Sequence, residues 1–482
     1  MNATTNNNAY TVSGVFKDGT DPNNIQNINW TTGYDGAATS PVTLSSYWIF
    51  KFQNLTPQYA NWSSVGQNGS LSAAQGFTLK GSGAGTATQN YTFVGKPNNG
   101  TITTPIAAGN LNLCGNPYPS ALDSNAFLTA NSSATTGSMY FWEHYSTNSS
   151  HILLDYQGGY AARNLVGGTP PVAPAGISNQ GSSTRVPSRY VPVGQGFLVY
   201  GSNTGGTITF DNSQRAFIKE DNALSNVMFR QNSTASADRT RDNSEDLPSG
   251  NADTFARIRL GFDSANNYHR QILMGFMDNL ATDGFDVGYD APQIDSQPND
   301  LYFKLGASEL VIQGVGSFNA NKIYPLSLKN SVEGNVKFVL DGVENLDVTQ
   351  NIFIHDNVTN LYHNIRNQDF QINLPVGIYA DRFSLRFSTS PNLGVDDFNE
   401  SEEVSVVYTS NDNMINISKG MSNADIKGVE LINMLGQNIK TWSVENTTGN
   451  KIQIPVTNIS TGTYIVKVMT SKGDLTKKII IK

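Results

Sequence analysis

The chain has 482 residues, of which 38% are hydrophobic and 15% are charged, and it contains 44 glycines. Its formal net charge of −8 argues against a nucleic-acid partner, because phosphate binding needs a clustered basic surface. It has no apolar run of about 18 residues, the length that a membrane-spanning helix needs, so we expect no transmembrane helix.

Residues 1–215 are predicted to form a β-sandwich-like domain. Charge is sparse in this region, and glycine and proline separate short alternating runs. This pattern is typical of an all-β sandwich or barrel-like fold. The expected strands include residues 46–52, 76–80, 91–95, 196–200 and 207–210.

The single cysteine, Cys114, excludes an internal disulfide and a cysteine-rich metal site. It lies in the alternating run Leu-Asn-Leu-Cys-Gly, where free cysteines are usually buried and unreactive. We therefore expect an inert core thiol, and we expect sheet packing to stabilise the chain in place of crosslinks.

Glu143 lies between Trp142 and His144, and Asp155 follows downstream. Two carboxylates beside an aromatic side chain suggest glycoside hydrolysis. A strand of this composition also fits a half-buried edge of a core. The sequence has no His-Glu-x-x-His, Gly-x-Ser-x-Gly or Walker motif. We therefore expect no catalytic residue and no enzyme.

Four of the five tryptophans lie in this first region. They suit either sugar-stacking platforms or core packing, and a tryptophan count does not show which rings face solvent. Both interpretations stay open for Trp30, Trp48, Trp62 and Trp142.

Residues 216–390 are predicted to form a second β-sandwich-like domain, with strands at 257–260, 269–276, 352–354 and 383–387. Within it, residues 278–300 hold six aspartates among glycines and prolines. Hard cations prefer such oxygen-rich irregular loops, although the spacing does not fit an EF-hand. The alternatives are calcium bound by Asp283, Asp286 and Asp290, or a solvated acidic loop; we expect no other cofactor.

An acidic linker at residues 391–403 leads to a terminal module at 404–482. Short alternating runs separated by turn residues predict a small β-sandwich that ends in a hairpin. Its expected strands are residues 414–418, 428–434, 438–444, 451–456, 463–469 and 475–481.

The sequences Val-Glu-Leu-Ile-Asn-Met-Leu-Gly-Gln at 429–437 and Thr-Gly-Thr-Tyr-Ile-Val-Lys-Val at 461–468 resemble the type A C-terminal sorting domain of type IX secretion. Gly473 and the final Lys-Lys-Ile-Ile-Ile-Lys add to this resemblance. The Asn-Pro pair that often opens the family is absent, and Ser-Asn-Asp-Asn stands at 410–413, which leaves the start of the module open.

The resemblance implies export through the periplasm and outer membrane of a Gram-negative Bacteroidota cell, to the surface or the medium. It implies recognition by an outer-membrane translocon barrel (SprA-like) and a shuttle barrel (PorV-like). The first residues lack the charged and apolar regions of a signal peptide, so for an exported protein we expect a native start before Met1. The expected signal elements are Gly436, Gly462, Tyr464, Val466, Gly473, Lys477, Lys478 and Lys482.

The part of the chain before the module resembles the passenger regions of surface proteins in gliding and biofilm-forming Bacteroidota, on the runs at 113–123, 140–144 and 156–160. This resemblance implies an adhesive or structural passenger. The alternative is a secreted carbohydrate-binding or carbohydrate-active protein, with surface glycans as partners. A carbohydrate-active protein predicts converging carboxylates beside exposed aromatic rings, whereas an adhesive or structural passenger predicts neither.

Overall fold

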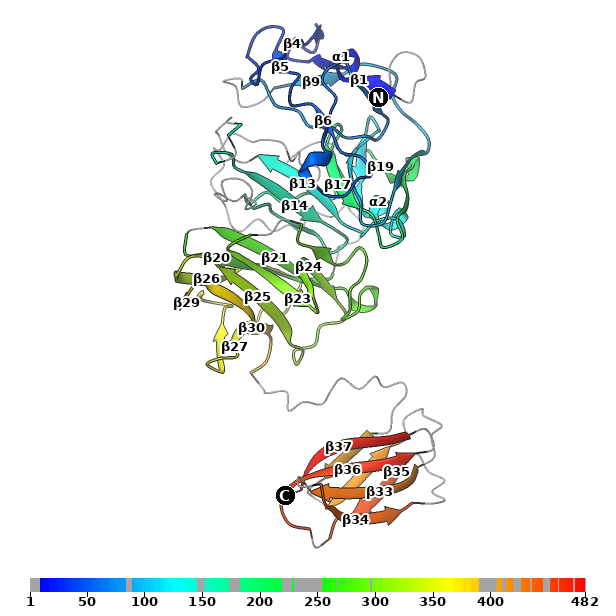
Figure 1. Ribbon diagram of the computed structural model, residues 1–482, viewed down its shortest axis with the longest axis vertical. Helices are drawn as coiled ribbons and strands as arrows, with labels where there is room; N and C mark the ends of the chain where they lie inside the picture. The colour runs from blue at the N-terminus through cyan, green and yellow to red at the C-terminus, as the bar shows by residue number, and fades with distance from the viewer. Residues whose placement is uncertain are drawn as a thin grey trace. The chain divides into compact units, whose positions relative to one another are not determined.

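The computed structural model describes residues 9–83, 89–144, 151–152, 154–172, 183–218, 228, 254–266, 268–294, 297–389, 405–409, 413–418, 426–433, 436–444, 451–457, 459–470 and 473–481. Within them strands predominate, and the α-helices are the short α1 (Val12–Val15) and α2 (Ser124–Ala130). The prediction of an all-β protein is confirmed. The chain divides into two compact units, Met1–Ser390 and Pro391–Lys482, which we call the body and the sorting sandwich (Figure 1).

The body begins with short strands around a small apolar core. Turn-forming glycines, asparagines and prolines interrupt the chain every few residues, which keeps these strands short. The pairs and triplets are β1 (Ala9–Thr11) with β8 (Ser70–Ser72), β3 (Gln26–Asn27) with β2 (Phe16–Asp18) and β9 (Tyr91–Phe93), β4 (Asn29–Thr31) with β5 (Thr43–Ser45), and β6 (Phe50–Lys51) with β7 (Ser63–Ser64).

A five-stranded antiparallel sheet follows, in the order β11 (Leu111–Gly115), β17 (Gly196–Tyr200), β13 (Met139–His144), β14 (Gly158–Arg163) and β15 (Gly168–Thr169). Helix α2 packs on one face, where Phe127 lies 5.4 Å from Phe197 between ring centroids. Beside this sheet stand β10 (Ile102–Ile106) paired with β18 (Gly206–Phe210), and β12 (Ala121–Asp123) between β16 (Tyr190–Val191) and β19 (Arg215–Ala216).

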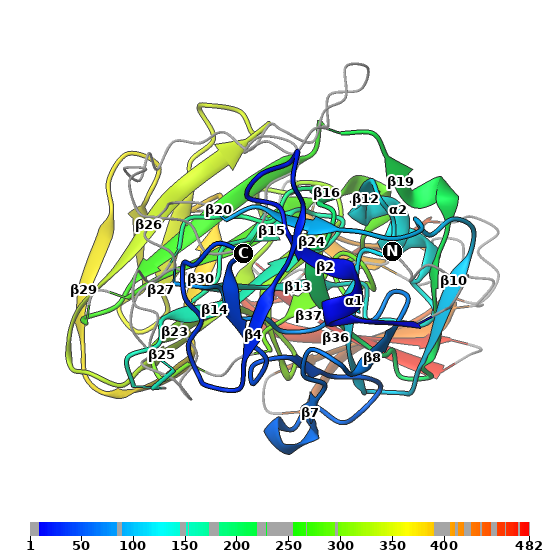
Figure 2. The ribbon, with the colours of Figure 1, turned by 90° about the horizontal axis from the view of Figure 1, so that it is seen from above.

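An eleven-stranded sheet forms the rest of the body. Its strands follow the order β28 (Leu361–Asn364), β27 (Phe353–Asp356), β30 (Gly377–Arg386), β25 (Tyr324–Asn330), β23 (Asp300–Leu305), β24 (Ser308–Val315), β21 (His269–Phe276), β20 (Ala256–Asp263), β26 (Gly334–Glu344) and β29 (Phe370–Leu374), with β22 (Ala291–Pro292) also on β24. The long strands β20 and β26 lie side by side in the view from above (Figure 2). Phe338 of β26 and Phe383 of β30 are far apart in the strand order, yet their rings meet at 5.0 Å. The sheet therefore curls around its own core.

The two regions of the body share one hydrophobic core. Tyr140 and Leu198 of the five-stranded sheet belong to the same buried cluster as Ile272 and Ile312 of the large sheet. Hydrogen bonds cross the same boundary: the hydroxyl of Tyr140 donates to the carbonyl of Pro292 at 3.0 Å. The sequence boundary expected at 215/216 thus falls between segments that are packed together.

The sorting sandwich has two antiparallel sheets. One contains β31 (Ser405–Thr409), β32 (Met414–Ser418) and β35 (Lys451–Pro455); the other runs in the order β34 (Asn438–Ser443), β33 (Ile426–Asn433), β36 (Gly462–Thr470) and β37 (Gly473–Ile481). Alternate residues of both sheets, such as Ile415, Leu431 and Val466, meet in a common core. Each buried aliphatic side chain of this kind contributes about 1.5–3 kcal/mol, which explains how so small a unit holds together.

Candidate functional site

Strand β37 lies at the edge of its sheet and pairs along its whole length with β36, from Gly462 opposite Ile481 to Thr470 opposite Gly473. Among the described residues no strand pairs with its outer side. The backbone N–H and C=O groups of an open edge accept another strand by β-augmentation. The edge is nine residues long, which is long enough to hold a partner strand in register.

Several expected signal residues lie in or beside the same sheet. Gly436 occupies the turn between β33 and β34 with φ of +81°, a conformation that favours glycine, and its N–H donates to the carbonyl of Asn433 at 3.0 Å. The ring of Tyr464 lies over Gly462, and its hydroxyl donates to the carbonyl of Ser460 at 2.9 Å. Val466 is fully buried in the core of the sandwich.

The side chains of β37 alternate between the core and solvent. Ile479 and Ile481 are buried, whereas Thr476, Lys478 and Ile480 are exposed. Lys477 lies opposite Val466 and is half-buried, Gly473 begins the strand, and Lys482 lies outside the described residues. The edge thus carries the cation of Lys478 on its solvent-exposed face.

The acidic loop keeps its carboxylates apart. Asp283 pairs with Lys322 at 2.6 Å, and the carboxylate of Asp286 accepts a hydrogen bond from the Thr282 hydroxyl at 2.8 Å. Asp290 is fully buried and accepts two backbone N–H groups at 2.7 and 3.1 Å. Among the residues that the structure describes, no group of three or more histidine, cysteine, aspartate or glutamate side chains is arranged to hold a metal ion. Calcium binding by Asp283, Asp286 and Asp290 therefore stays a prediction.

Glu143 lies on β13 and is 3% exposed. Burial raises its pKa to about 7, although Arg185, at 3.7 Å between Nε and Oε1, acts in the opposite direction. His144 stacks on Tyr156 with 4.6 Å between ring centroids, and Asp155 is exposed. The charged partner of Glu143 is therefore a guanidinium, not the second carboxylate that glycoside hydrolysis requires.

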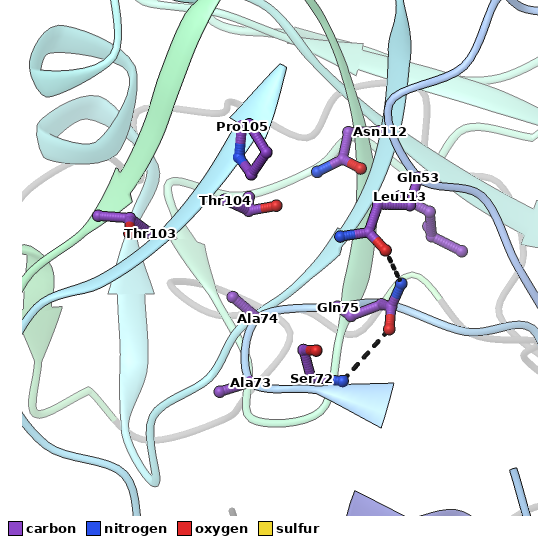
Figure 3. A pocket seen from close by; sticks show the side chains of 10 residues that line it. All are labelled: Gln53, Ser72, Ala73, Ala74, Gln75, Thr103, Thr104, Pro105, Asn112 and Leu113. Carbon is purple, nitrogen blue, oxygen red and sulfur yellow. Dashed lines mark hydrogen bonds between the residues drawn. The ribbon is translucent and has the colours of Figure 1, made fainter. Parts of the chain in front are cut away.

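A cavity of about 230 Å³ opens beside β10 and β11. Figure 3 shows Gln75 in its wall, where the side-chain amide donates to Gln53 at 2.6 Å and its oxygen accepts the N–H of Ser72 at 3.2 Å. All ten residues that line the cavity are uncharged. It therefore suits water or a small neutral molecule better than a phosphate or carboxylate.

Sequence reasoning did not find the network around His269. Its Nδ1 lies 2.6 Å from Asp263 and its Nε2 lies 3.0 Å from Asp341, which also accepts a hydrogen bond from Gln271. Burial lowers the pKa of His269, but the two carboxylates outweigh it and raise this pKa to about 9. Because the carboxylates bind opposite ring nitrogens, they do not converge on a point where a metal would sit. The network is an ion triplet that joins β20, β21 and β26.

Sequence reasoning also missed an exposed aromatic cluster, made of Tyr34, Tyr47, Trp48 and His151, which we call the aromatic platform. Only Trp48 of its members was a candidate in the sequence. The other three candidate tryptophans contact other aromatic or core residues. Trp30 packs on the first core, Trp62 lies 5.3 Å from Phe52, and Trp142 lies 4.7 Å from Tyr160.

Two family models match the chain. One, described as a domain of unknown function (DUF8693), matches residues 22–387, and the other, described as a secretion system C-terminal sorting domain, matches residues 410–482. The predicted sorting-domain resemblance is confirmed, and the resemblance of the preceding part to surface adhesins stays a prediction. No curated protein matches the chain. The helices in the described part of the chain are too short or too polar to span a bilayer.

Proposed function

This chain belongs to the DUF8693 family, and on that premise we propose that its body is a non-catalytic adhesive or structural passenger that the sorting sandwich carries to the cell surface. The sorting domain makes the protein a cargo of type IX secretion that is exported to the surface or the medium. The finer proposal concerns how the sandwich is recognised and what the body does after export.

The open edge of β37 carries the proposal for recognition. An outer-membrane translocon barrel and shuttle barrel of a Bacteroidota cell would add a strand to this edge, because β37 is the last strand of its sheet in the described chain. Lys478, exposed on the same strand, would steer a partner that carries negative charge. Tyr464 acts by positioning the edge, because it lies on the neighbouring strand β36, whereas Gly436 shapes the turn into β34 at the other edge of the sheet.

Charge pairing in the body supports a non-catalytic role. Asp123 pairs with Arg189 at 2.8 Å and caps α2, and Asp300 pairs with Arg270 at 2.6 Å. Glu143 faces Arg185. Each of these buried or half-buried carboxylates has a cation beside it and no second carboxylate, which favours a scaffold over an acid–base pair.

Export of tagged chains from a type IX-competent strain tests recognition at the edge. With a signal peptide placed before Met1 of each chain, we expect the full chain in the medium or on cells, and a chain ending at residue 389 retained in the periplasm. Lys478→Glu should be retained to a large extent, because it places an anion on the edge. Thr441→Glu, on the opposite edge strand β34, is the matched control and should be exported normally. Equal export of the two glutamate variants would refute recognition at β37.

A secreted carbohydrate-binding protein is the second candidate. The aromatic platform favours it, because stacking rings that face solvent are the feature expected of a sugar-binding surface.

A further inference from the structure

The aromatic platform gathers rings from segments that are distant in the sequence. Tyr34 follows β4, Tyr47 and Trp48 follow β5, and His151 lies beyond β13. Tyr34 is central: its ring centroid lies 4.8 Å from Tyr47, 5.9 Å from Trp48 and 5.0 Å from His151. The rings therefore form one contiguous cluster, in which the plane of Tyr47 stands at 87° to that of Tyr34 and at 79° to that of Trp48.

The platform is open to solvent. Tyr34 is 50% exposed and Tyr47 is 45% exposed, while Trp48 is half-buried beneath them and His151 is exposed. A contiguous group of exposed aromatic rings marks an interaction site more often than scattered single rings do.

Hydrogen bonds hold the backbone around Tyr34 and Trp48 in place. The indole Nε1 of Trp48 donates to the carbonyl of Tyr34 at 2.7 Å, and the hydroxyl of Thr78 donates to the carbonyl of Trp48 at 2.6 Å. The hydroxyl of Ser45 donates to the carbonyl of Gly33 at 2.6 Å, which fixes the loop that carries Tyr34. A preorganised surface loses little conformational entropy on binding.

The charges beside the rings cancel. Lys80 pairs with Asp35 at 2.6 Å, and its ammonium lies 5.7 Å from the centroid of the Trp48 ring. Asp35 is 67% exposed, so its carboxylate can still accept hydrogen bonds from a ligand. A surface with stacking faces and a self-neutralised pair of polar groups complements an uncharged ligand that presents both C–H groups and hydroxyls.

We propose that the aromatic platform binds a neutral saccharide, whose C–H groups pack on the nearly perpendicular rings of Tyr34 and Tyr47 and whose hydroxyls reach Asp35. This inference deepens the adhesive role proposed above by naming the class of ligand. It concerns the purified protein, so its failure is distinguishable from a failure of export.

A proline-rich peptide is the main competitor for an aromatic surface. Peptide carbonyls need hydrogen-bond donors, but the indole N–H of Trp48 is already donated to Tyr34, and the ammonium of Lys80 is held by Asp35. Saccharide hydroxyls both donate and accept, so they are better suited to a carboxylate next to stacking rings.

Affinity electrophoresis of the full chain in gels that contain laminarin, mannan, xylan, dextran or pullulan tests the proposal. We expect retardation by at least one of these neutral polysaccharides. Tyr34→Ala/Tyr47→Ala should weaken that binding about tenfold or more, because two stacking rings are lost. Tyr34→Phe keeps the ring and should keep the binding.

Tyr59→Ala is the matched control, because Tyr59 is 87% exposed but lies outside the platform. Binding that Tyr59→Ala abolishes, or that the double variant leaves unchanged, would overturn the proposal. Lack of retardation in all five gels would do the same. Binding only to alginate would show an anion site, and binding only to a decaproline peptide would assign the platform to peptides; each result overturns the saccharide assignment.

Discussion

The buried pair of Arg270 and Asp300 makes a sharp test of how the large sheet is stabilised. Arg270 of β21 donates through Nε and Nη2 to the two carboxylate oxygens of Asp300 at 2.6 and 2.9 Å, and Asp300 is fully buried. The backbone N–H of Leu301 and the amide of Gln293 also donate to Asp300. Asp300→Asn keeps the shape of the side chain but leaves a buried guanidinium without its counter-charge.

Removing one partner of a buried ion pair costs about 3–5 kcal/mol, whereas replacing both partners with apolar residues of similar volume is often neutral. In a unit as large as the body, each kcal/mol lost lowers the thermal unfolding midpoint by about 2 °C. We therefore expect Asp300→Asn to lower this midpoint by roughly 6–10 °C. The double variant Arg270→Met/Asp300→Leu should lose much less.

Circular dichroism and tryptophan fluorescence of the full chain, followed during thermal and guanidinium unfolding, measure these differences. A double variant that is destabilised as much as Asp300→Asn would refute the reasoning. In that case the cost would come from packing and from the other hydrogen bonds of Asp300, not from an uncompensated charge.

Two further stability predictions follow from the structure. Gly436→Ala places a Cβ in the left-handed region and should cost the sorting sandwich about 1 kcal/mol, or roughly 4–8 °C in its unfolding midpoint; an unchanged midpoint would show that the turn tolerates a side chain. The raised pKa of His269 means that its charged form is favoured in the folded state, so this stabilisation is full below about pH 6.5 and is lost as pH rises through about 9. Midpoints measured from pH 6 to pH 9.5 should therefore fall more steeply for the natural chain than for His269→Gln, and parallel curves would contradict the assignment.

The sorting sandwich was largely predictable because its core strands alternate strictly. Residues 463–469 and 475–481 were expected as a hairpin, and the structure has β36 at Gly462–Thr470 and β37 at Gly473–Ile481. Tyr464 and Val466 point to the core, as their alternation predicts. In a small two-layer fold each strand has one buried face and one exposed face, so the alternation along the strand is sufficient to predict it.

The aromatic platform and the His269 network were not predictable for the opposite reason. Tyr34 and His151 meet only because distant loops fold together, and no periodicity links them. Asp341 reaches His269 from β26, which follows several intervening strands. Sites assembled by tertiary contacts leave no signal in spacing. Local pattern also failed where turns interrupt the chain: the expected strand at 76–80 was wrong, and only Phe50–Lys51 of the expected strand at 46–52 forms one.

The shared core of the body has a consequence for how such proteins change during evolution. The large sheet buries Leu111, Tyr140 and Leu198 of the preceding region. Recombination that exchanged only one of the two regions would therefore leave apolar surface exposed in the product. The matched family model also runs without a break across this boundary. We therefore expect the body to be inherited as one piece, and new binding properties to arise by substitution in its loops, where Tyr34 and Tyr47 lie.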